Sequence, residues 1–168
     1  MTRRSLLKLF GLASVGAVAA GAGISAPQAA TATSSYTKEQ WKKLLPPDAY
    51  RVLFEEDTER PGSSPLNHEK REGTFICAAC FNPIFESRHK YDSGTGWPSF
   101  FKPIDGAIGT KSDRSFFTER TEYHCAHCGG HMGHVFEDGP QPTGLRYCNN
   151  GVSLNFIPKG QPLPALRS

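Results

Sequence analysis

Beyond its first thirty residues, the sequence has no long apolar run, no excess of either charge and no long stretch with helical periodicity. Without a second apolar segment, we expect no membrane-spanning helix in the mature protein. The formal charge of +3 comes from Arg3, Arg4 and Lys8, which no acid accompanies in the first thirty residues. The remaining chain is electrically balanced and lacks the basic surface expected of a nucleic-acid-binding protein. At 168 residues it has room for one compact core.

The first thirty residues have the composition of an export signal. Two adjacent arginines precede GLASVGAVAAGAGISA, a run of small and moderately apolar residues, and alanine-rich residues near 26–32 offer a cleavage site. The pattern TRRSLLK resembles the twin-arginine signals of bacteria, a route that exports folded proteins. A permanent membrane anchor is the alternative, but the run is too rich in glycine and alanine. We expect a signal peptide and linker over residues 1–32, a functional domain over 33–168, and export to the bacterial periplasm.

Two short helices are expected at the start of the domain. Thr37 followed by Gln40 is a capping-box pattern, and Pro46-Pro47 ends the first run. The second helix is expected over residues 48–55. The residues expected to face inward are Trp41, Leu44 and Leu45 in the first helix and Tyr50, Leu53 and Phe54 in the second.

Beyond Gly73 the sequence changes to short runs rich in Phe, Thr, Ile and Tyr, interrupted by Gly, Pro and Asn. This texture is typical of a mainly antiparallel β domain. Asn150-Gly151, followed by alternating apolar residues, is the strongest hairpin signal in the chain. It predicts that Cys148 lies at a strand end beside a tight turn.

Four of the five cysteines form two Cys-x-x-Cys pairs, FICAAC with Cys77 and Cys80, and YHCAHC with Cys125 and Cys128. Together they supply the four sulfurs that structural zinc prefers. Two disulfides are an alternative in an exported protein, and a thioredoxin-like redox motif is another, although no βαβ pattern accompanies it. We expect one structural zinc ion that joins two distant hairpins and is loaded in the reducing cytoplasm before export.

Cys148 remains as a single thiol. A free cysteine is often a small buried apolar residue, but the neighbours of this one indicate chemistry. Arg146 lies two residues away on the same strand face and can favour the thiolate, and Asn150 offers an amide for hydrogen bonding. The nearby segment GGHMGHVFEDG supplies proton donors, namely His131, His134, Glu137 and Asp138.

The motifs SGTGWPSF, HCAHCGGHMGHVFEDGP and RYCNNGVSLNF, in this order, resemble those of the type B methionine-R-sulfoxide reductases. The resemblance covers roughly residues 37–158. It implies a mainly β fold of two antiparallel sheets with short N-terminal helices and a structural zinc site. It also implies reduction of the R epimer of methionine sulfoxide, chiefly in oxidised proteins or peptides. We expect the protein to act as a monomer.

Carried over by motif, the resemblance assigns the family's nucleophile to Cys148 and the aromatic wall for the substrate methyl group to Trp97. The polar network around the sulfoxide oxygen corresponds to His131, His134 and Asp138, with Arg146 and Asn150 beside the nucleophile. A sulfoxide sulfur is electrophilic only if its oxygen is protonated or strongly hydrogen-bonded as it leaves. Attack by Cys148 with proton delivery would give methionine and a sulfenic acid on Cys148.

Thr95 stands where many members of this family carry a second, resolving cysteine. Because threonine forms no disulfide and the other cysteines are expected on zinc, we expect an outside reductant, either a thioredoxin-like reductase or a small thiol. A different class of function is a zinc-stapled module that binds a peptide or ligand without catalysis. Such a module would explain the zinc and the aromatic residues, but not a lone cysteine flanked by Arg146 and Asn150.

Overall fold

The computed structural model describes residues 34–114 and 119–167. The expected signal peptide over residues 1–32 lies outside this part of the chain. Within the described residues, no helix is both long enough and apolar enough to cross a membrane.

Two short helices open the described chain, as predicted. Helix α1 (Lys38–Leu44) begins at a capping box in which Thr37 accepts from the Gln40 backbone and the Gln40 side chain accepts in return. Helix α2 (Pro47–Glu55) has proline at its first position, where the missing N–H costs nothing. Trp41 and Leu53 are fully buried beneath the helices, but Leu44 is 48% exposed, so its expected inward orientation is wrong.

The fold is mainly β, with two antiparallel sheets, as predicted. The remaining elements, in order, are η1 (Pro65–His68), β1 (Gly73–Cys77), β2 (Pro83–Glu86), η2 (Ser87–His89), β3 (Lys90–Tyr91), β4 (Ser99–Phe100), β5 (Ile108–Asp113), β6 (Arg120–Cys125), β7 (His131–Phe136), β8 (Arg146–Asn149), η4 (Gly151–Ser153) and β9 (Leu154–Pro158). The smaller sheet has the order β2-β1-β9, and the larger has the order β3-β4-β8-β7-β6-β5.

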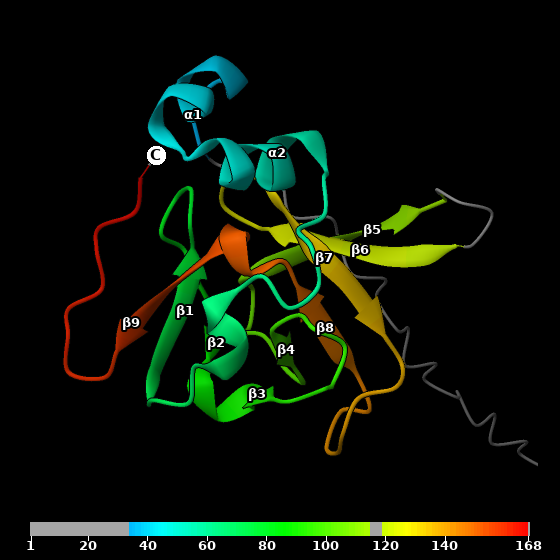
Figure 1. The fold of residues 1–168 in the computed structure, drawn as a ribbon. Helices are drawn as coiled ribbons and strands as arrows, with labels where there is room; N and C mark the ends of the chain where they lie inside the picture. Colours follow the sequence, from blue (N-terminus) through cyan, green and yellow to red (C-terminus); the bar gives the residue numbers. More distant parts are fainter. Residues whose placement is uncertain (1–33, 115–118, 168) are drawn as a thin grey trace, which may run out of the picture.

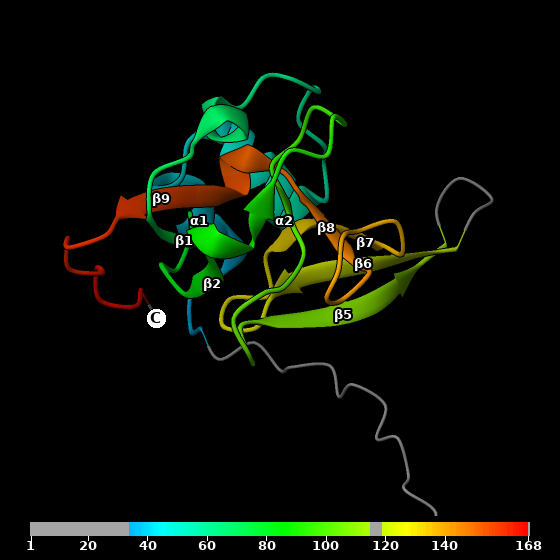
Figure 2. The ribbon, with the colours of Figure 1, turned by 90° about the horizontal axis from the view of Figure 1, so that it is seen from below.

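The two sheets occupy opposite sides of the molecule, with β1 and β9 on one side and β5, β6 and β7 on the other (Figures 1 and 2). The helices lie at one end, at the top of Figure 1. Aromatic rings join the sheets: Phe85 on β2 stacks on Phe100 of β4 at 4.0 Å between ring centroids, and Phe75 on β1 meets Phe100 edge-on at 5.0 Å. All three rings are fully buried, so one core serves both sheets.

The predicted hairpin at Asn150-Gly151 is wrong. Strand β8 pairs with β4 and β7, whereas β9 pairs with β1 in the other sheet. The Asn-Gly pair instead begins the single turn η4, through which the chain passes from one sheet to the other. A Cβ on Gly151 would collide with the Ser64 hydroxyl, so close packing explains the glycine here.

Candidate active site

A pocket of about 140 Å³ opens beside strands β7 and β8. Its lining comprises Thr58, Trp97, Arg120, Gly133, His134, Phe136, Cys148, Asn149 and Asn150. Four residues singled out from the sequence therefore meet here: Trp97, His134, Cys148 and Asn150. Three others, His131, Asp138 and Arg146, are not part of the lining.

Strand register places Cys148 beside His134. Cys148 on β8 is paired with His134 on β7 and with Ser99 on β4, and His134 is paired in turn with Glu122 on β6. Residues directly opposite each other in antiparallel strands project from the same face of the sheet. The register therefore gathers a hydroxyl, a thiol, an imidazole and a carboxylate into one row across four strands.

Cys148 is partly buried, and burial raises the pKa of its thiol. The Arg146 charge and hydrogen bonds from Thr95 and Arg146 lower the pKa of Cys148, but burial outweighs them. Arg146 thus acts in the direction expected from the sequence, while the net effect keeps the sulfur a thiol in the free protein at neutral pH. The thiol must lose its proton as it reacts.

Arg146 is held in a fixed position. Its guanidinium forms a fork with Asp138, with Nε 2.8 Å from Oδ1 and Nη2 2.9 Å from Oδ2, and lies 4.2 Å from the centre of the Phe136 ring. The hydrogen bond from Arg146 lowers the pKa of Asp138. Asp138 is therefore an ionised acceptor that orients the cation next to Cys148.

His131 lies in the interior rather than at the pocket. The ring is buried, and its Nδ1 lies 3.0 Å from Glu122 Oε1, while the other Glu122 oxygen lies 3.3 Å from Lys111 Nζ. Burial opposes ionisation of Glu122, but its contacts with His131 and Lys111 prevail and lower its pKa. The His131 ring packs edge-on against His134 with 5.5 Å between centroids. His131 and Glu122 thus form a buried layer beneath His134.

His134 contacts a carboxylate that the sequence reasoning missed. Its Nε2 lies 2.8 Å from Asp113 Oδ2, and Arg120 Nη2 lies 2.7 Å from the same oxygen. Burial lowers the pKa of His134, although the Asp113 hydrogen bond raises it. Nothing in the local sequence around Asp113 indicates this contact, because it joins strands 21 residues apart.

Glu59 is a second residue that the sequence reasoning missed. Its carboxylate accepts from the backbone N–H of Gly151 at 2.6 Å and of Val152 at 3.0 Å. Its backbone N–H donates to Asn150 Oδ1 at 3.0 Å, and its carbonyl accepts from Trp97 Nε1 at 3.2 Å. One residue thereby ties the turn after Cys148 to the indole of the pocket wall. The Asn150 amide also donates to Met132 O, so it braces strands and does not point freely at the thiol.

Hydroxyl groups surround the other side of Cys148. Ser93 Oγ lies 2.8 Å from Thr95 Oγ1 and 2.7 Å from Ser99 Oγ, and the Thr95 side chain lies close enough to the Cys148 thiol to lower its pKa. Thr95 therefore occupies a position from which a side chain reaches the sulfur.

The four paired cysteines form one buried cluster. Their sulfur atoms all lie within 4.8 Å of one another, with 3.7 Å between Cys77 and Cys128 and 3.5 Å between Cys80 and Cys125. These separations are close to the edge of about 3.8 Å that a tetrahedron of sulfurs has when each metal–sulfur bond is about 2.3 Å. The four cysteines can therefore hold a metal ion.

Two matching turns build this cluster. Cys77 and Cys80 lie in the β1–β2 turn, where Phe81 N–H donates to Cys77 O. Cys125 and Cys128 lie in the β6–β7 turn, where Gly129 N–H makes the equivalent bond to Cys125 O. The residue after the second cysteine of each pair has a left-handed backbone conformation, with φ of 67° at Phe81 and 74° at Gly129. The cluster joins the two sheets at their turns.

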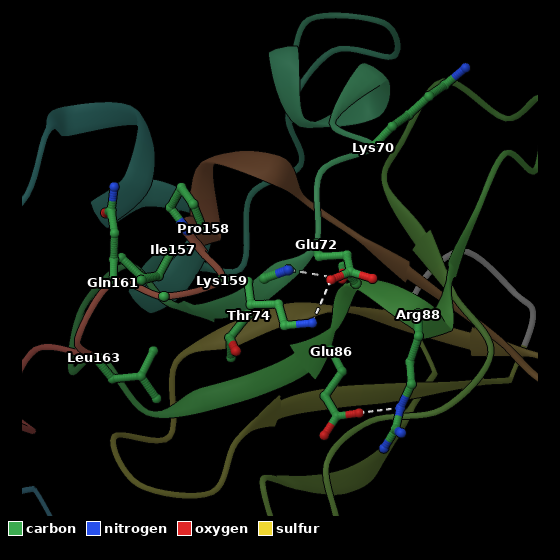
Figure 3. Close-up of a pocket in the computed structure, with 13 residues that line it drawn as sticks. Lys70, Glu72, Thr74, Glu86, Arg88, Ile157, Pro158, Lys159, Gln161 and Leu163 are labelled. Atoms are coloured by element: carbon green, nitrogen blue, oxygen red, sulfur yellow. Dashed lines mark hydrogen bonds and ion pairs between the residues drawn. The ribbon is translucent and has the colours of Figure 1, made fainter.

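A larger hollow, of about 620 Å³, lies over the smaller sheet and the segment that follows β9 (Figure 3). Four of its five charged residues form two ion pairs, since Lys159 Nζ lies 2.7 Å from Glu72 Oε2 and Arg88 pairs with Glu86; the fifth is Lys70. Its lining contains no cysteine, histidine or aromatic residue. Size alone would point to this hollow, but the reactive groups are in the smaller pocket.

The chain is similar to known proteins over most of its length. A family model described as "SelR domain" matches residues 45–158. The peptide methionine sulfoxide reductase MsrB of Methanosarcina barkeri is 52% identical over 121 residues, which cover 71% of this chain and 85% of the relative. Proteins of the same name from Leptospira interrogans and Bradyrhizobium diazoefficiens are each 51% identical, over 70% and 73% of this chain and 91% and 89% of the relatives.

Proposed function

The chain belongs to the MsrB family of peptide methionine sulfoxide reductases, and we propose that it reduces the R epimer of methionine sulfoxide. The proposed reaction proceeds through a sulfenic acid at Cys148. The observation that carries the proposal is the pocket itself, in which Cys148, His134 and Trp97 share one lining. The substrates are methionine sulfoxide residues of oxidised proteins or peptides, and the exported form acts in the periplasm.

In the first step, the Cys148 sulfur attacks the sulfoxide sulfur while the sulfoxide oxygen receives a proton. The protonated oxygen then moves to the Cys148 sulfur as its bond to the substrate sulfur and the new sulfur–sulfur bond both break. Methionine leaves, Cys148 becomes a sulfenic acid, and the proton lost by the thiol replaces the one that was donated to the oxygen. His134 donates the proton, and Arg146, oriented by Asp138, favours the developing thiolate. His131 supports His134 from the buried layer.

Trp97 provides the wall for the substrate methyl group. Sulfur–aromatic contacts contribute about 0.3–1.5 kcal/mol, enough to bias which substituent of the sulfoxide faces the ring. The site offers the methyl group a wall at Trp97, which is tied to Glu59, and offers the oxygen a proton donor at His134, while Cys148 in β8 faces the sulfur. Three fixed contacts of this kind distinguish the two epimers, and the choice of the R epimer follows from the resemblance to the type B methionine-R-sulfoxide reductases.

The second step consumes an external thiol. Thr95 lies where a resolving cysteine would lie, and the chain's remaining four cysteines form the metal cluster. An outside thiol attacks the sulfenic acid, water leaves, and a mixed disulfide with Cys148 forms; a second thiol releases the reduced enzyme. A thioredoxin-like reductase or a small thiol supplies these electrons.

Zinc is the metal we assign to the cluster, since four buried thiols near tetrahedral spacing suit it. Cys77, Cys80, Cys125 and Cys128 would hold it. Zinc in such a closed site contributes to folding and not to redox chemistry.

The function is tested by incubating the mature protein and dithiothreitol with each epimer of a methionine sulfoxide peptide separately. We expect loss of the R epimer alone, and no reaction with a Cys148→Ser variant. Equal reduction of both epimers would contradict the proposed selectivity, and activity in the Cys148→Ser variant would contradict the proposed nucleophile.

A further inference from the structure

Asp113 and Arg120 form a charged pair at the edge of the pocket. They are register partners on β5 and β6, and Arg120 contributes to the pocket lining. Asp113 Oδ2 contacts both Arg120 Nη2 and His134 Nε2, at 2.7 and 2.8 Å. The Asp113 and His134 side chains are only 12% and 16% exposed, so water screens this contact weakly.

The contact determines which nitrogen of His134 carries a proton. A carboxylate accepts hydrogen bonds and donates none, so the proton in this contact belongs to His134 Nε2. The other ring nitrogen, Nδ1, then carries a proton only when the whole ring is an imidazolium cation. The acid that donates a proton from Nδ1 is therefore the imidazolium cation. The negative charge of Asp113 stabilises the positive charge of this cation.

We propose that Asp113 is a positioning residue for sulfoxide reduction, which directs His134 Nε2 toward β5, leaves Nδ1 for the sulfoxide oxygen and stabilises the imidazolium that donates the proton. The role in proton donation rests on the proposed function, whereas the ring orientation stands on the contact itself. Arg120 restrains Asp113 by binding the same oxygen and opposes part of its effect on His134.

The titratable and charged groups that face His134 predict opposite shifts of the pH profile when Asp113 or Arg120 is removed. They are Asp113 on β5, Arg120 and Glu122 on β6, His131 on β7 and Cys148 on β8. Burial lowers the pKa of His134 most strongly, Asp113 raises it, and Arg120 lowers it. Because the acid is the protonated form, the chemical step slows as pH rises through the His134 pKa. Removing Asp113 should move this decline to lower pH, and removing Arg120 should move it to higher pH.

The test measures single-turnover reduction of the R epimer against pH, using the mature, metal-loaded protein. Asp113→Asn should slow the step at neutral pH by roughly 10- to 100-fold, less than the 10²- to 10⁴-fold that general acid catalysis supplies in full. The fall in rate with rising pH should shift to lower pH in Asp113→Asn and to higher pH in Arg120→Gln. Asp105→Asn is the matched control, because its side chain is 90% exposed and its partner is Lys102. An Asp113→Asn profile that coincides with that of the control would overturn the proposal.

A second measurement needs no variant. Nitrogen-15 NMR of the imidazole rings in the unsubstituted protein should show neutral His134 with its proton on Nε2. A proton on Nδ1 would overturn the proposal even if Asp113→Asn fails to fold. Failure of the unsubstituted protein to reduce any sulfoxide would instead contradict the proposed function, because the NMR measurement reports the ring orientation independently.

Discussion

At the level of single residues, the proposed nucleophile, Cys148, lies in the pocket lining, whereas several of the polar groups around it lie outside the lining. Cys148 and His134 line the pocket. Outside the lining, Arg146 contacts Phe136 and is held by Asp138, and His131 packs against His134. Burial raises the pKa of Cys148 and lowers that of His134, so both are neutral in the resting protein at neutral pH. The proposed reaction therefore requires that the thiol lose a proton and that the imidazolium form of His134 supply one.

Replacing His134 by Gln should remove the proton donor while preserving the shape of the pocket. We expect turnover of the chemical step to fall by roughly 10²- to 10⁴-fold, the usual contribution of a general acid. Metal content and the thermal unfolding midpoint should stay close to those of the parent. Stopped-flow measurement of single turnovers checks this, and an unchanged rate would assign proton delivery to another group.

Replacing Thr95 by cysteine should restore an internal recycling route. The Thr95 side chain lies close enough to the Cys148 thiol to lower its pKa, so we expect a thiol at this position to be close to the sulfenic acid. After one turnover without reductant, mass spectrometry should find a disulfide between residues 95 and 148. Thr95→Ser is the matched control and should retain the sulfenic acid; a sulfenic acid that persists in the Thr95→Cys variant would contradict this placement.

At the level of structural elements, turns and strand ends carry the site. The Cys-x-x-Cys turns and the capping box were predictable from sequence because each is a local pattern with its own hydrogen bonds. The turn at Asn150-Gly151 was not, since contacts with Ser64 and Glu59, about ninety residues away, replace the expected hairpin. Glu59 and Asp113 escaped prediction for the same reason: their roles arise only when distant segments meet.

Removing the Glu59 carboxylate should loosen η4 and the loop that carries Trp97. Hydrogen bonds to a charged group contribute about 1.5–3 kcal/mol each, so Glu59→Ala should lower the free energy of unfolding by at least about that amount. We expect KM to rise more than kcat falls, because the indole wall shifts relative to β8. Glu55→Ala, on the exposed face of α2, is the control. Steady-state kinetics and urea unfolding measure both effects, and equal behaviour of the two variants would contradict the role of Glu59.

Across the whole molecule, the cluster of four cysteines and the aromatic core both join the two sheets. The fold class was predictable from the texture of short strands and the four cysteines, but the order of strands was not, because register depends on long-range pairing. Within the candidate site, the sequence supplied Cys148, His134 and Trp97, whereas which of the polar residues line the pocket required the structure.

Removing the metal should separate the two sheets at their turns. The free energy of metal binding at such a site also contributes to the free energy of folding. The Cys77→Ser variant should therefore lose the metal, and much of its domain should unfold. Elemental analysis of the purified mature protein should find about one zinc per chain, the content expected for a single tetrahedral site. The exposed Ser63→Ala substitution serves as a control for mutation alone. Two disulfides and no metal would contradict the zinc assignment.

In the proposed mechanism, oxygen passes from the substrate to Cys148 and remains there until an external thiol attacks. The most direct measurement gives the reduced protein one equivalent of R-methionine sulfoxide peptide without reductant, adds dimedone, and maps the label by mass spectrometry. We expect one equivalent of methionine peptide to form. Dimedone should label Cys148 alone and leave the four clustered cysteines unlabelled. A disulfide between Cys148 and a cluster cysteine, or methionine formed without label on Cys148, would contradict it.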